Sequence, residues 1–428
     1  MAKVSLAASG KLSGKIEVPP SKSYTHRAVL MASLASGESR ISRPLVSRDT
    51  LATYSACRAM GAKLEGSDAG LTVVGSEPRA AQDVVNVENS GTTLRFMTSV
   101  FTLPERGCTV LTGDASIRRR PMQGLLDALS GLGAKAWSSN GNGCAPIIVG
   151  EGGMTGGNTT MRGDVSSQFV SSILISAPLA QGDSTLKVTD PVSRPYIEAT
   201  LMLSGLHGIR IERDGVSNFS IPGQQVYKPH DFSVPADFSS ASFVMTAVAL
   251  IGGKVELSGL DASLPQGDSA IVDILVRMGL RVDRRGDSVL VQADGERLKG
   301  GSFDLSDTPD LLPVLAMLAL KCEEPLEITG VAHARFKETD RIGVATEGLQ
   351  KMGVRVEERH DGMKITRPVR LSRTVLDAHD DHRMFMAFAL ASMLAPDDVR
   401  VVGEESLDVS YPDFLENMQG LGVRVVRE

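Results

Sequence analysis

Basic side chains recur in this sequence where a buried helix is expected to begin. Lys22 and Arg27 lie in PPSKSYTHR, directly before the apolar run AVLMASLA, and Arg383 ends DAHDDHR before another apolar run. The N-terminus of a helix carries partial positive charge, so cations alone are unfavourable there. Cations become favourable when an anion binds among them, the backbone N–H groups and the hydroxyls. The pattern therefore predicts an anion-binding site at these helix starts.

The starts of the other expected buried helices carry polar side chains that fit the same site. They read ENSGTTLR (with Gly91 and Arg95), VSSQF (with Ser166, Ser167 and Gln168), DFSSAS, and DTPD (with Asp310). Polar residues at helix starts are common as caps, so each segment alone has an ordinary structural interpretation. Convergence of several such segments on one place is what favours a binding site.

Three consecutive arginines precede another expected helix. GDASIRRRPM carries Arg118, Arg119 and Arg120 before Pro121, which we expect to begin an amphipathic helix. A solvent-exposed basic loop is an equally good interpretation for Arg118 and Arg119.

The segment HARFKETDRIG (333–343) combines both signs of charge, with Lys337 and Arg341 flanking Glu338. An ordinary charged helix entry, capped by Thr339, is the alternative interpretation. Cations that flank a carboxylate are what phosphate binding combined with proton transfer requires.

Composition and charge exclude several function classes. The 428 residues carry a formal net charge of −6, so no global field attracts nucleic acid. The four cysteines form no C-x-x-C pair, which argues against zinc and favours buried reduced thiols, with Cys108 in the core. We find no signal peptide, membrane-spanning run, nucleotide-type phosphate loop or serine-enzyme motif, and expect a cytoplasmic enzyme.

A repeated phrase sets the expected architecture. MGAKL, LGAKA, HGIRI, MGLRV, MGVRV and LGVRV recur with steps of 69 to 75 residues between their glycines, which are Gly61, Gly133, Gly208, Gly279, Gly353 and Gly422. Each phrase is typical of an amphipathic helix that ends in a left-handed glycine before a strand. Each is preceded by an apolar run expected as a buried helix, at 28–35, 93–103, 169–180, 241–253, 311–320 and 383–395. The unit is therefore β-α-β-α-β-β, and six units predict two domains of three.

The motifs resemble those of the 3-phosphoshikimate 1-carboxyvinyltransferase (EPSP synthase) family. PPSKSYTHR, NSGTTLR, LTGD…RRRPM, SSQF, SRPY, TPD, KETDRI and DDHRM occur in the family's order along almost the whole chain. The resemblance implies a two-domain inside-out α/β barrel, with three βαβαββ repeats per domain around buried central helices. It implies an N-terminal domain of 21–234, a C-terminal domain of 1–20 and 235–428, and an active site in the interdomain cleft.

The implied reaction joins phosphoenolpyruvate to the 5-hydroxyl of 3-phosphoshikimate and releases phosphate through a tetrahedral intermediate, with neither a metal nor an organic cofactor. The family pattern places on 3-phosphoshikimate Lys22, Ser23, Arg27, Ser166, Ser167, Gln168, Ser193, Asp310 and Lys337, with Tyr196 nearby. It places on phosphoenolpyruvate Lys22, Gly91, Arg120, Gln168, Arg341 and Arg383. Asp310 and Glu338 stand at the proton-acceptor and proton-donor positions, and Lys22 shares the proton work.

Two positions depart from the pattern of some members. His333 replaces an Asn, and Val409 in DVSYPDF stands where some members carry a Lys, so no binding role is assigned to Val409. The resemblance also implies a cytoplasmic monomer that binds neither nucleic acid nor membrane. Glyphosate inhibits the family, and Gly91 is compatible with sensitivity.

Two other functions fit part of the pattern. A UDP-N-acetylglucosamine enolpyruvyl transferase shares the fold, but a reactive cysteine is expected in its loop, and GDASIRRRP (113–121) has none. A non-catalytic protein that closes two lobes over a phosphorylated metabolite would use the same cations. It would have no use for Asp310 and Glu338 beside them, because carboxylates weaken anion binding.

Overall fold

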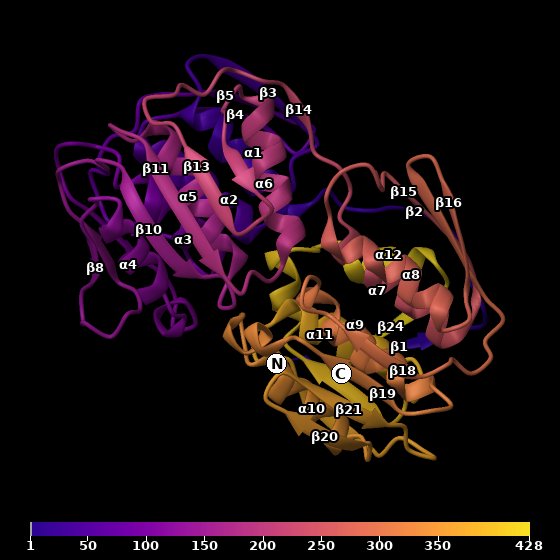
Figure 1. Cartoon of the computed structure of the whole chain (residues 1–428). Helices are drawn as coiled ribbons and strands as arrows, with labels where there is room; N and C mark the ends of the chain where they lie inside the picture. The colour runs from indigo at the N-terminus through magenta and orange to yellow at the C-terminus, as the bar shows by residue number, and fades with distance from the viewer. Residues whose placement is uncertain (1) are drawn as a thin grey trace. The chain divides into compact units, whose positions relative to one another are not determined.

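The chain forms two compact units, each of which contains three small sheets and their helices. The computed structural model describes residues 2–428. One unit consists of the residues up to Pro19 together with Ala236–Glu428, and the other consists of Pro20–Pro235 (Figure 1). The chain therefore passes between the units twice, after Pro19 and after Pro235.

Six four-stranded sheets share one strand pattern. In each, the first strand is parallel to the second, the second is antiparallel to the third, and the third is antiparallel to the fourth. In the Pro20–Pro235 unit the sheets are β14 (Phe232–Ser233)–β3 (Glu38–Ser42)–β5 (Gly70–Val74)–β4 (Lys63–Ser67), β6 (Val85–Asn86)–β7 (Thr109–Thr112)–β9 (Ile147–Val149)–β8 (Ala136–Ser138), and β10 (Gly157–Arg162)–β11 (Ser184–Thr189)–β13 (Asn218–Ile221)–β12 (Glu212–Asp214). In the other unit they are β2 (Leu12–Glu17)–β15 (Gly253–Ser258)–β17 (Ser288–Ala293)–β16 (Arg281–Arg285), β18 (Gly301–Asp304)–β19 (Leu326–Thr329)–β21 (Gly362–Thr366)–β20 (Arg355–Arg359), and β22 (Thr374–Asp377)–β23 (Val399–Val402)–β1 (Val4–Ala8)–β24 (Val423–Arg427).

Three strands near the two points where the chain passes between units pair with strands that are distant in sequence. β1 pairs with β24, with Leu6 opposite Val425, and β2 pairs in parallel with β15, with Ile16 opposite Leu257. β14 pairs with β3 in the same way, with Phe232 opposite Ile41. The first strand of one repeat in each unit thus comes from a segment distant in sequence.

The apolar runs form buried helices, as predicted. They are α1 (Lys22–Leu34), α3 (Gly91–Val100), α5 (Ser167–Ser176), α7 (Phe238–Ile251), α9 (Leu312–Leu318) and α11 (His382–Ser392). In α7 every residue except Ile251 is buried, because side chains on all faces of the helix are apolar or small. Each large apolar side chain buried in this way contributes about 1.5–3 kcal/mol.

The amphipathic helices of the repeats end where predicted. They are α2 (Arg48–Met60), α4 (Gln123–Gly131), α6 (Arg194–Leu206), α8 (Ala270–Arg277), α10 (Arg341–Lys351) and α12 (Phe414–Gly420). The six repeat glycines follow them with φ between 76° and 122°, a left-handed region that favours glycine. The expected start of α4 at Pro121 is wrong, since that helix begins at Gln123.

Short 3₁₀ helices complete the fold and carry several candidate residues. They are η1 (Ile117–Arg119), η2 (Ala177–Leu179), η3 (Gly267–Ser269), η4 (Pro309–Leu311), η5 (Ala319–Lys321), η6 (Ala332–Phe336) and η7 (Glu404–Val409). The mixed α/β two-domain fold is confirmed, although the described residues form six separate sheets rather than a closed barrel.

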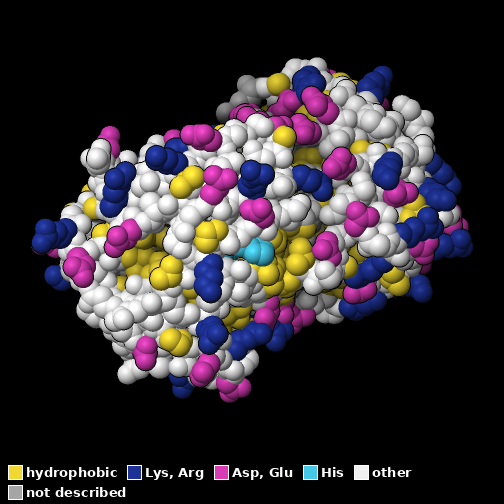
Figure 2. Space-filling view, turned by 90° about the horizontal axis from the view of Figure 1, so that it is seen from above, with side chains coloured by type: hydrophobic (Ala, Val, Ile, Leu, Met, Phe, Trp, Pro, Cys, Tyr) yellow, Lys and Arg dark blue, Asp and Glu magenta, His cyan; other side chains and the backbone are white. Residues whose placement is uncertain are grey.

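Charged side chains of both signs lie on the molecular surface. On the face seen in Figure 2, Lys and Arg side chains are interspersed with Asp and Glu side chains. Among residues 2–428, no helix has both the length and the apolar character needed to cross a bilayer.

The cysteines differ in part from expectation. Cys57 and Cys322 are buried and all four are free, but Cys108 is exposed and Cys144 is half-buried. Cys108 precedes β7 instead of lying inside it, beside Gly107 with φ of 90°. The prediction of a core position for Cys108 is therefore wrong.

Candidate active site

In the Pro20–Pro235 unit, the candidate residues gather at the starts of α1, α3 and α5. Ser90 Oγ accepts a hydrogen bond from Thr93 N at 3.2 Å, and Ser166 Oγ accepts one from Gln168 N at 3.3 Å. Ser21 occupies the corresponding place before α1, but its side chain does not cap the helix. α3 and α5 pack against each other, so their first turns belong to one group.

Arg27 is a buried cation without a carboxylate neighbour. Its guanidinium donates to Thr200 Oγ1 at 2.8 Å, Ser23 O at 3.0 Å, Tyr196 O at 3.1 Å and Ser171 Oγ at 3.3 Å. Its exposed fraction is 2%, and no carboxylate among residues 2–428 contacts it. Burial lowers the pKa of Arg27 to about 10. A desolvated guanidinium held only by neutral oxygens is suited to an external anion.

A chain of polar contacts holds Lys22 and continues to α3. Lys22 Nζ lies 2.8 Å from Asp49 Oδ2, and His26 Nε2 lies 3.6 Å from Asp49 Oδ1. His26 Nδ1 is 2.7 Å from Thr53 Oγ1, which is 2.6 Å from Thr93 Oγ1. Burial lowers the pKa of His26 despite the carboxylate beside it. Asp49 therefore holds the ammonium of Lys22, and Thr93 joins this chain to the first turn of α3.

Gly91 is the first residue of α3 and lies close to two guanidinium groups. A Cβ added to Gly91 would lie 2.5 Å from Nη1 of Arg120 and 3.2 Å from Nη1 of Arg95. Arg120 Nη2 donates to Asn89 Oδ1 at 3.1 Å and to Ser116 Oγ at 3.3 Å. Only glycine allows the cations to approach the helix start this closely.

Gln168 links α5 to α3 at the same place. Its Oε1 accepts from Arg95 Nη1 at 2.5 Å, and its Nε2 donates to Thr92 Oγ1 at 2.9 Å. Ser167 is buried, whereas Ser166 and Ser23 are half-buried. These hydroxyls, amides and cations lie at the starts of α3 and α5.

Ser193 adds a strained backbone position to this unit. It precedes α6 with φ of 52° and ψ of 39°, is 3% exposed, and its side chain does not cap the helix. Left-handed backbone at a non-glycine residue costs about 1–3 kcal/mol and is found preferentially at functional sites. Tyr196, three residues later, is half-buried.

The three arginines of GDASIRRRPM separate by burial. Arg120 is 5% exposed, whereas Arg118 and Arg119 are exposed. Arg118 donates to the carbonyl of Gly113 in its own loop. The solvent-exposed interpretation therefore holds for Arg118 and Arg119, and Arg120 alone belongs to the buried group.

In the other unit, Arg341 organises three carboxylates. It lies at the start of α10 and is 1% exposed. Its Nη1 donates to Asp310 Oδ1 at 2.8 Å, its Nη2 to Glu338 Oε2 at 2.6 Å, and its Nε to Asp381 Oδ2 at 2.8 Å. These carboxylates lower the free energy of the charged guanidinium and, despite burial, raise the pKa of Arg341. We call these four residues, with Lys337 and Arg383, the Arg341 cluster.

Asp310 lies among the three cations of this cluster. Its Oδ1 is 3.4 Å from Lys337 Nζ, and its Oδ2 is 3.3 Å from Nη2 of Arg383. Burial would raise the pKa of Asp310, but Arg383, Lys337 and Arg341 hold it well below the usual range. Burial lowers the pKa of Lys337. The cluster therefore places an ionised carboxylate and an ammonium group side by side.

Asp381, in the motif DDHR, binds Arg341 and caps α11. Sequence reasoning assigned it no role. Its Oδ1 accepts from Arg383 N at 2.9 Å and caps α11, while Thr339 Oγ1 donates to Oδ2 at 3.1 Å. Thr339 therefore does not cap α10, whose N-cap is Asp340. An Asp directly before a helix start is the signal that identifies such a cap.

Three further residues are Asp49 and the two positions that depart from the family pattern, His333 and Val409. Asp49 follows the N-cap Ser47 of α2, and no local signal in the sequence connects it with Lys22. His333 is buried in η6, and Val409 is buried at the end of η7. A buried apolar side chain at 409 supplies no charge.

Comparison with known proteins decides the family. The profile of EPSP synthase (3-phosphoshikimate 1-carboxyvinyltransferase) matches residues 6–418. The chain belongs to the EPSP synthase family. Relatives named 3-phosphoshikimate 1-carboxyvinyltransferase are 46% identical in Methanothermobacter thermautotrophicus and 42% identical in Nitrosopumilus maritimus, covering 97–98% of this chain and 98% of theirs. A solved EPSP synthase from Acinetobacter baumannii is 26% identical over the full length of both chains, with a TM-score of 0.82.

Membership of the EPSP synthase family confirms the fold and the reaction class expected from the motifs. It supports 3-phosphoshikimate 1-carboxyvinyltransferase activity in the shikimate pathway, with 3-phosphoshikimate and phosphoenolpyruvate as the family's substrates. The chain is thus a transferase by family. The roles of its individual residues are proposals.

Proposed function

We propose that this chain transfers the enolpyruvyl group of phosphoenolpyruvate to the 5-hydroxyl of 3-phosphoshikimate, and that residues of both units serve this one reaction. The observation that carries the proposal is the Arg341 cluster, in which Asp310 and Glu338 contact the same guanidinium. A protein that only binds anions gains nothing from carboxylates on its cations. Proton transfer to and from a bound substrate needs an acid and a base, and carboxyl groups can serve as both.

The substrate contacts follow from the chemistry of each group. Arg27 holds the phosphate of 3-phosphoshikimate, because it is a buried cation that no carboxylate of the described chain neutralises. The other proposed contacts of this substrate are Lys22, Ser23, Ser166, Ser167, Gln168, Ser193, Asp310 and Lys337. The proposed contacts of phosphoenolpyruvate are Lys22, Gly91, Arg120, Gln168, Arg341 and Arg383. Arginine suits the second set, because it grips carboxylate and phosphate with two donors.

In the addition step, the 5-oxygen bonds to C2 of phosphoenolpyruvate while C3 gains a proton. We assign the proton of the 5-hydroxyl to Asp310 and the proton delivered to C3 to Glu338, with Lys22 sharing the proton work. Asp310 is ionised before substrate binds, because its three cations lower its pKa. A bound substrate anion neutralises part of that positive charge, so Asp310 becomes a stronger base when it is needed.

In the elimination step, the tetrahedral intermediate loses the proton from C3 and the bond from C2 to the phosphate oxygen breaks. Glu338 recovers its proton, phosphate leaves with the proton that Asp310 took from the 5-hydroxyl, and the enol ether remains. Cations near the departing phosphate stabilise its charge, a role that fits Arg120 and Arg383.

The test is phosphate release from purified protein mixed with both substrates, with each substrate omitted in turn and no metal added. Release that requires both substrates supports the transferase. Binding of 3-phosphoshikimate without release would favour a two-lobe binder. Release with UDP-N-acetylglucosamine instead would favour the sister transferase, although residues 113–121 contain no cysteine and Cys108 lies outside that loop. We also propose a cytoplasmic monomer that needs no cofactor and binds neither nucleic acid nor membrane.

A further inference from the structure

A buried carboxyl group that the proposed mechanism does not use lies at the start of α7. Asp268, in η3, is 2% exposed. Its Oδ2 accepts a hydrogen bond from the hydroxyl of Ser239, in the first turn of α7. Its Oδ1 is buried and has no hydrogen-bond partner among residues 2–428. A buried carboxylate with one satisfied oxygen is costly, so something besides local stability accounts for an acid there.

The segment around Asp268 is fixed tightly to α7. Gln266 Oε1 accepts from Phe238 N at 3.1 Å, and Gln266 Nε2 donates to Ala236 O at 2.9 Å. Asp237 caps the same turn by accepting from Ser239 N at 2.7 Å. Gln266 and Asp268 thus both bind the beginning of the helix, and the carboxyl of Asp268 would lose its hydrogen bond from Ser239 if it turned toward solvent.

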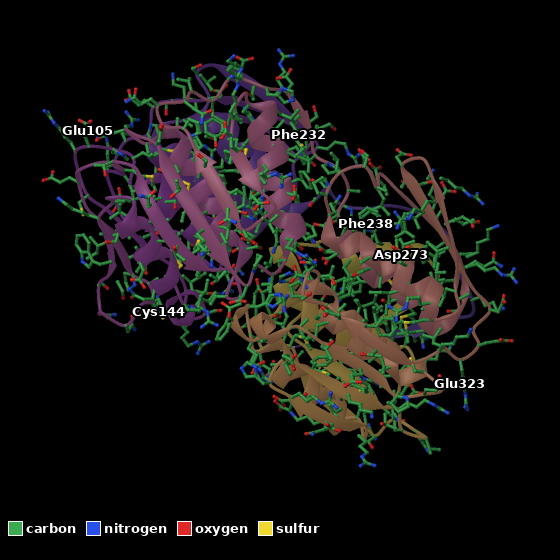
Figure 3. The ribbon with its side chains drawn as sticks, in the orientation of Figure 1. Glu105, Cys144, Phe232, Phe238, Asp273 and Glu323 are labelled. Carbon is green, nitrogen blue, oxygen red and sulfur yellow. The ribbon has the colours of Figure 1, made fainter. Side chains whose placement is uncertain are left out.

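The charged neighbours of Asp268 belong to the Arg341 cluster and to α7. α7 packs against η3, η4 and α11, the elements that carry Asp268, Asp310 and Arg383. Asp310 and Arg383 act on Asp268 electrostatically, as does Asp237 at the start of α7. α8 also packs against η3, but its Asp273 (labelled in Figure 3) is exposed and pairs with Arg284 at 3.6 Å. Burial and Asp310 raise the pKa of Asp268 to about 7, against the opposing effects of Arg383 and the Ser239 hydroxyl.

We propose that Asp268 is a positioning residue that sets the charge beside the Asp310–Arg383 pair and thereby controls phosphoenolpyruvate binding. In its neutral form it adds no charge that competes with the substrate for Arg383. In its ionised form it adds a second carboxylate near that guanidinium and weakens the binding of a further anion. The inference rests on the proposed function, because it assumes that Arg383 holds phosphoenolpyruvate.

The sign of the pH dependence follows directly. Below neutral pH Asp268 carries a proton and the KM for phosphoenolpyruvate is low; above it the carboxylate forms and the KM rises. We expect the KM for phosphoenolpyruvate to rise by about five- to tenfold. This is the size expected for the repulsion between one unit charge and the substrate anion in a partly solvated site. The phosphate of the substrate titrates near pH 6 as well. The informative quantity is therefore the ratio of the wild-type KM to the variant KM at each pH.

Three variants test the proposal in steady-state assays between pH 5.5 and 9. Asp268→Asn keeps the shape and the hydrogen bond from Ser239 but removes the charge, so its KM should not follow the wild-type rise. Ser239→Ala removes the hydrogen bond that favours the ionised form, so the wild-type rise should move to higher pH. Asp273→Asn, an exposed carboxylate on α8, is the matched control and should reproduce the wild-type profile.

The outcomes separate the possible failures. A constant ratio of wild-type to Asp268→Asn KM across the pH range overturns the proposal, as does a loss of kcat that is the same at every pH. If the wild type releases no phosphate at all, the proposed function fails instead. A ¹³C NMR titration of labelled aspartate carboxyls still tests Asp268 in that case: one resonance should titrate near neutral pH and be absent from Asp268→Asn. Absence of that resonance from the wild type would contradict the inference by itself.

Discussion

Substitution of Gly91 by Ala gives a sharp test of the proposed phosphoenolpyruvate contacts. The added Cβ would lie 2.5 Å from Nη1 of Arg120, so the guanidinium must move by roughly 1 Å to reach ordinary contact. Asn89 and Ser116 hold its other nitrogen, and the movement must lengthen or break those hydrogen bonds. A displacement of about 1 Å at a catalytic site can cost roughly 10²-fold in rate.

We therefore expect Gly91→Ala to lower kcat/KM for phosphoenolpyruvate by about 10- to 100-fold, within the range for such a displacement. The KM for 3-phosphoshikimate should change little, because Arg27 does not contact Gly91. The assay is phosphate release with one substrate varied at saturating concentration of the other. Stability in urea should stay near wild type, since alanine is a better helix former than glycine.

Gly205→Ala is the matched control for this experiment. Gly205 lies within α6, and apart from its chain neighbours and the backbone of its own helix no atom lies within 4 Å of the position of its added Cβ. This variant should keep wild-type kinetics for both substrates. Unchanged kcat/KM for phosphoenolpyruvate in Gly91→Ala, with the control also unchanged, would refute the placement of Arg120 over the substrate.

Four further outcomes are expected. Glu338→Gln should lower kcat by about 10²- to 10⁴-fold, the usual contribution of a general acid, with little loss of substrate binding by calorimetry; equal losses in kcat and affinity would contradict its role. Arg27→Ala should weaken 3-phosphoshikimate binding by about 1.5–3 kcal/mol with a smaller effect on phosphoenolpyruvate, and the reverse order would exchange the two assignments. Asp381→Asn should lower the free energy of unfolding in urea by about 3–5 kcal/mol at pH 7, because it breaks a fully buried ion pair with Arg341. Since the pKa of Asp381 is lowered on folding, that difference should shrink as the pH falls below about 4, where the unfolded carboxyl is protonated. Glyphosate should inhibit the wild type, and full turnover at saturating inhibitor would show that Gly91 does not confer sensitivity.

The sequence predicted the parts of the fold that local patterns determine. The six buried helices follow from apolar runs, and the six helix ends follow from the glycine phrase, because both depend on neighbouring residues. The start of α4 was placed two residues early, since proline at a first turn is a preference and not a requirement. The residues of β1, β2 and β14 pair with strands distant in sequence, and composition carries no signal for such pairing.

The site residues also divide into those that a local sequence pattern indicates and those that depend on long-range packing. Helix-start cations such as Lys22 and Arg383 were found because their position is unusual for a helix. Asp49 was missed because its ion pair with Lys22 joins different helices, and Asp268 was missed because its burial depends on the packing of η3 against α7. The strand-like segment GCTVLTG predicts a core position for Cys108, but β7 begins one residue later and Cys108 is exposed.

The contacts of Arg341 constrain how the proposed site can work. A guanidinium has five N–H donors, and four hydrogen bonds from Arg341 go to Asp310, Glu338 and Asp381. One Nη1 hydrogen is therefore left for a substrate, so Arg341 cannot grip a carboxylate with two donors unless it releases one of these partners. Asp381 accepts two of these hydrogen bonds and also caps α11, and Asp310 also contacts Lys337 and Arg383, whereas Glu338 accepts one hydrogen bond from Nη2. If phosphoenolpyruvate displaces Glu338 from Arg341, that carboxyl loses a cation that favours its charged form, which is the change that a proton donor to C3 requires.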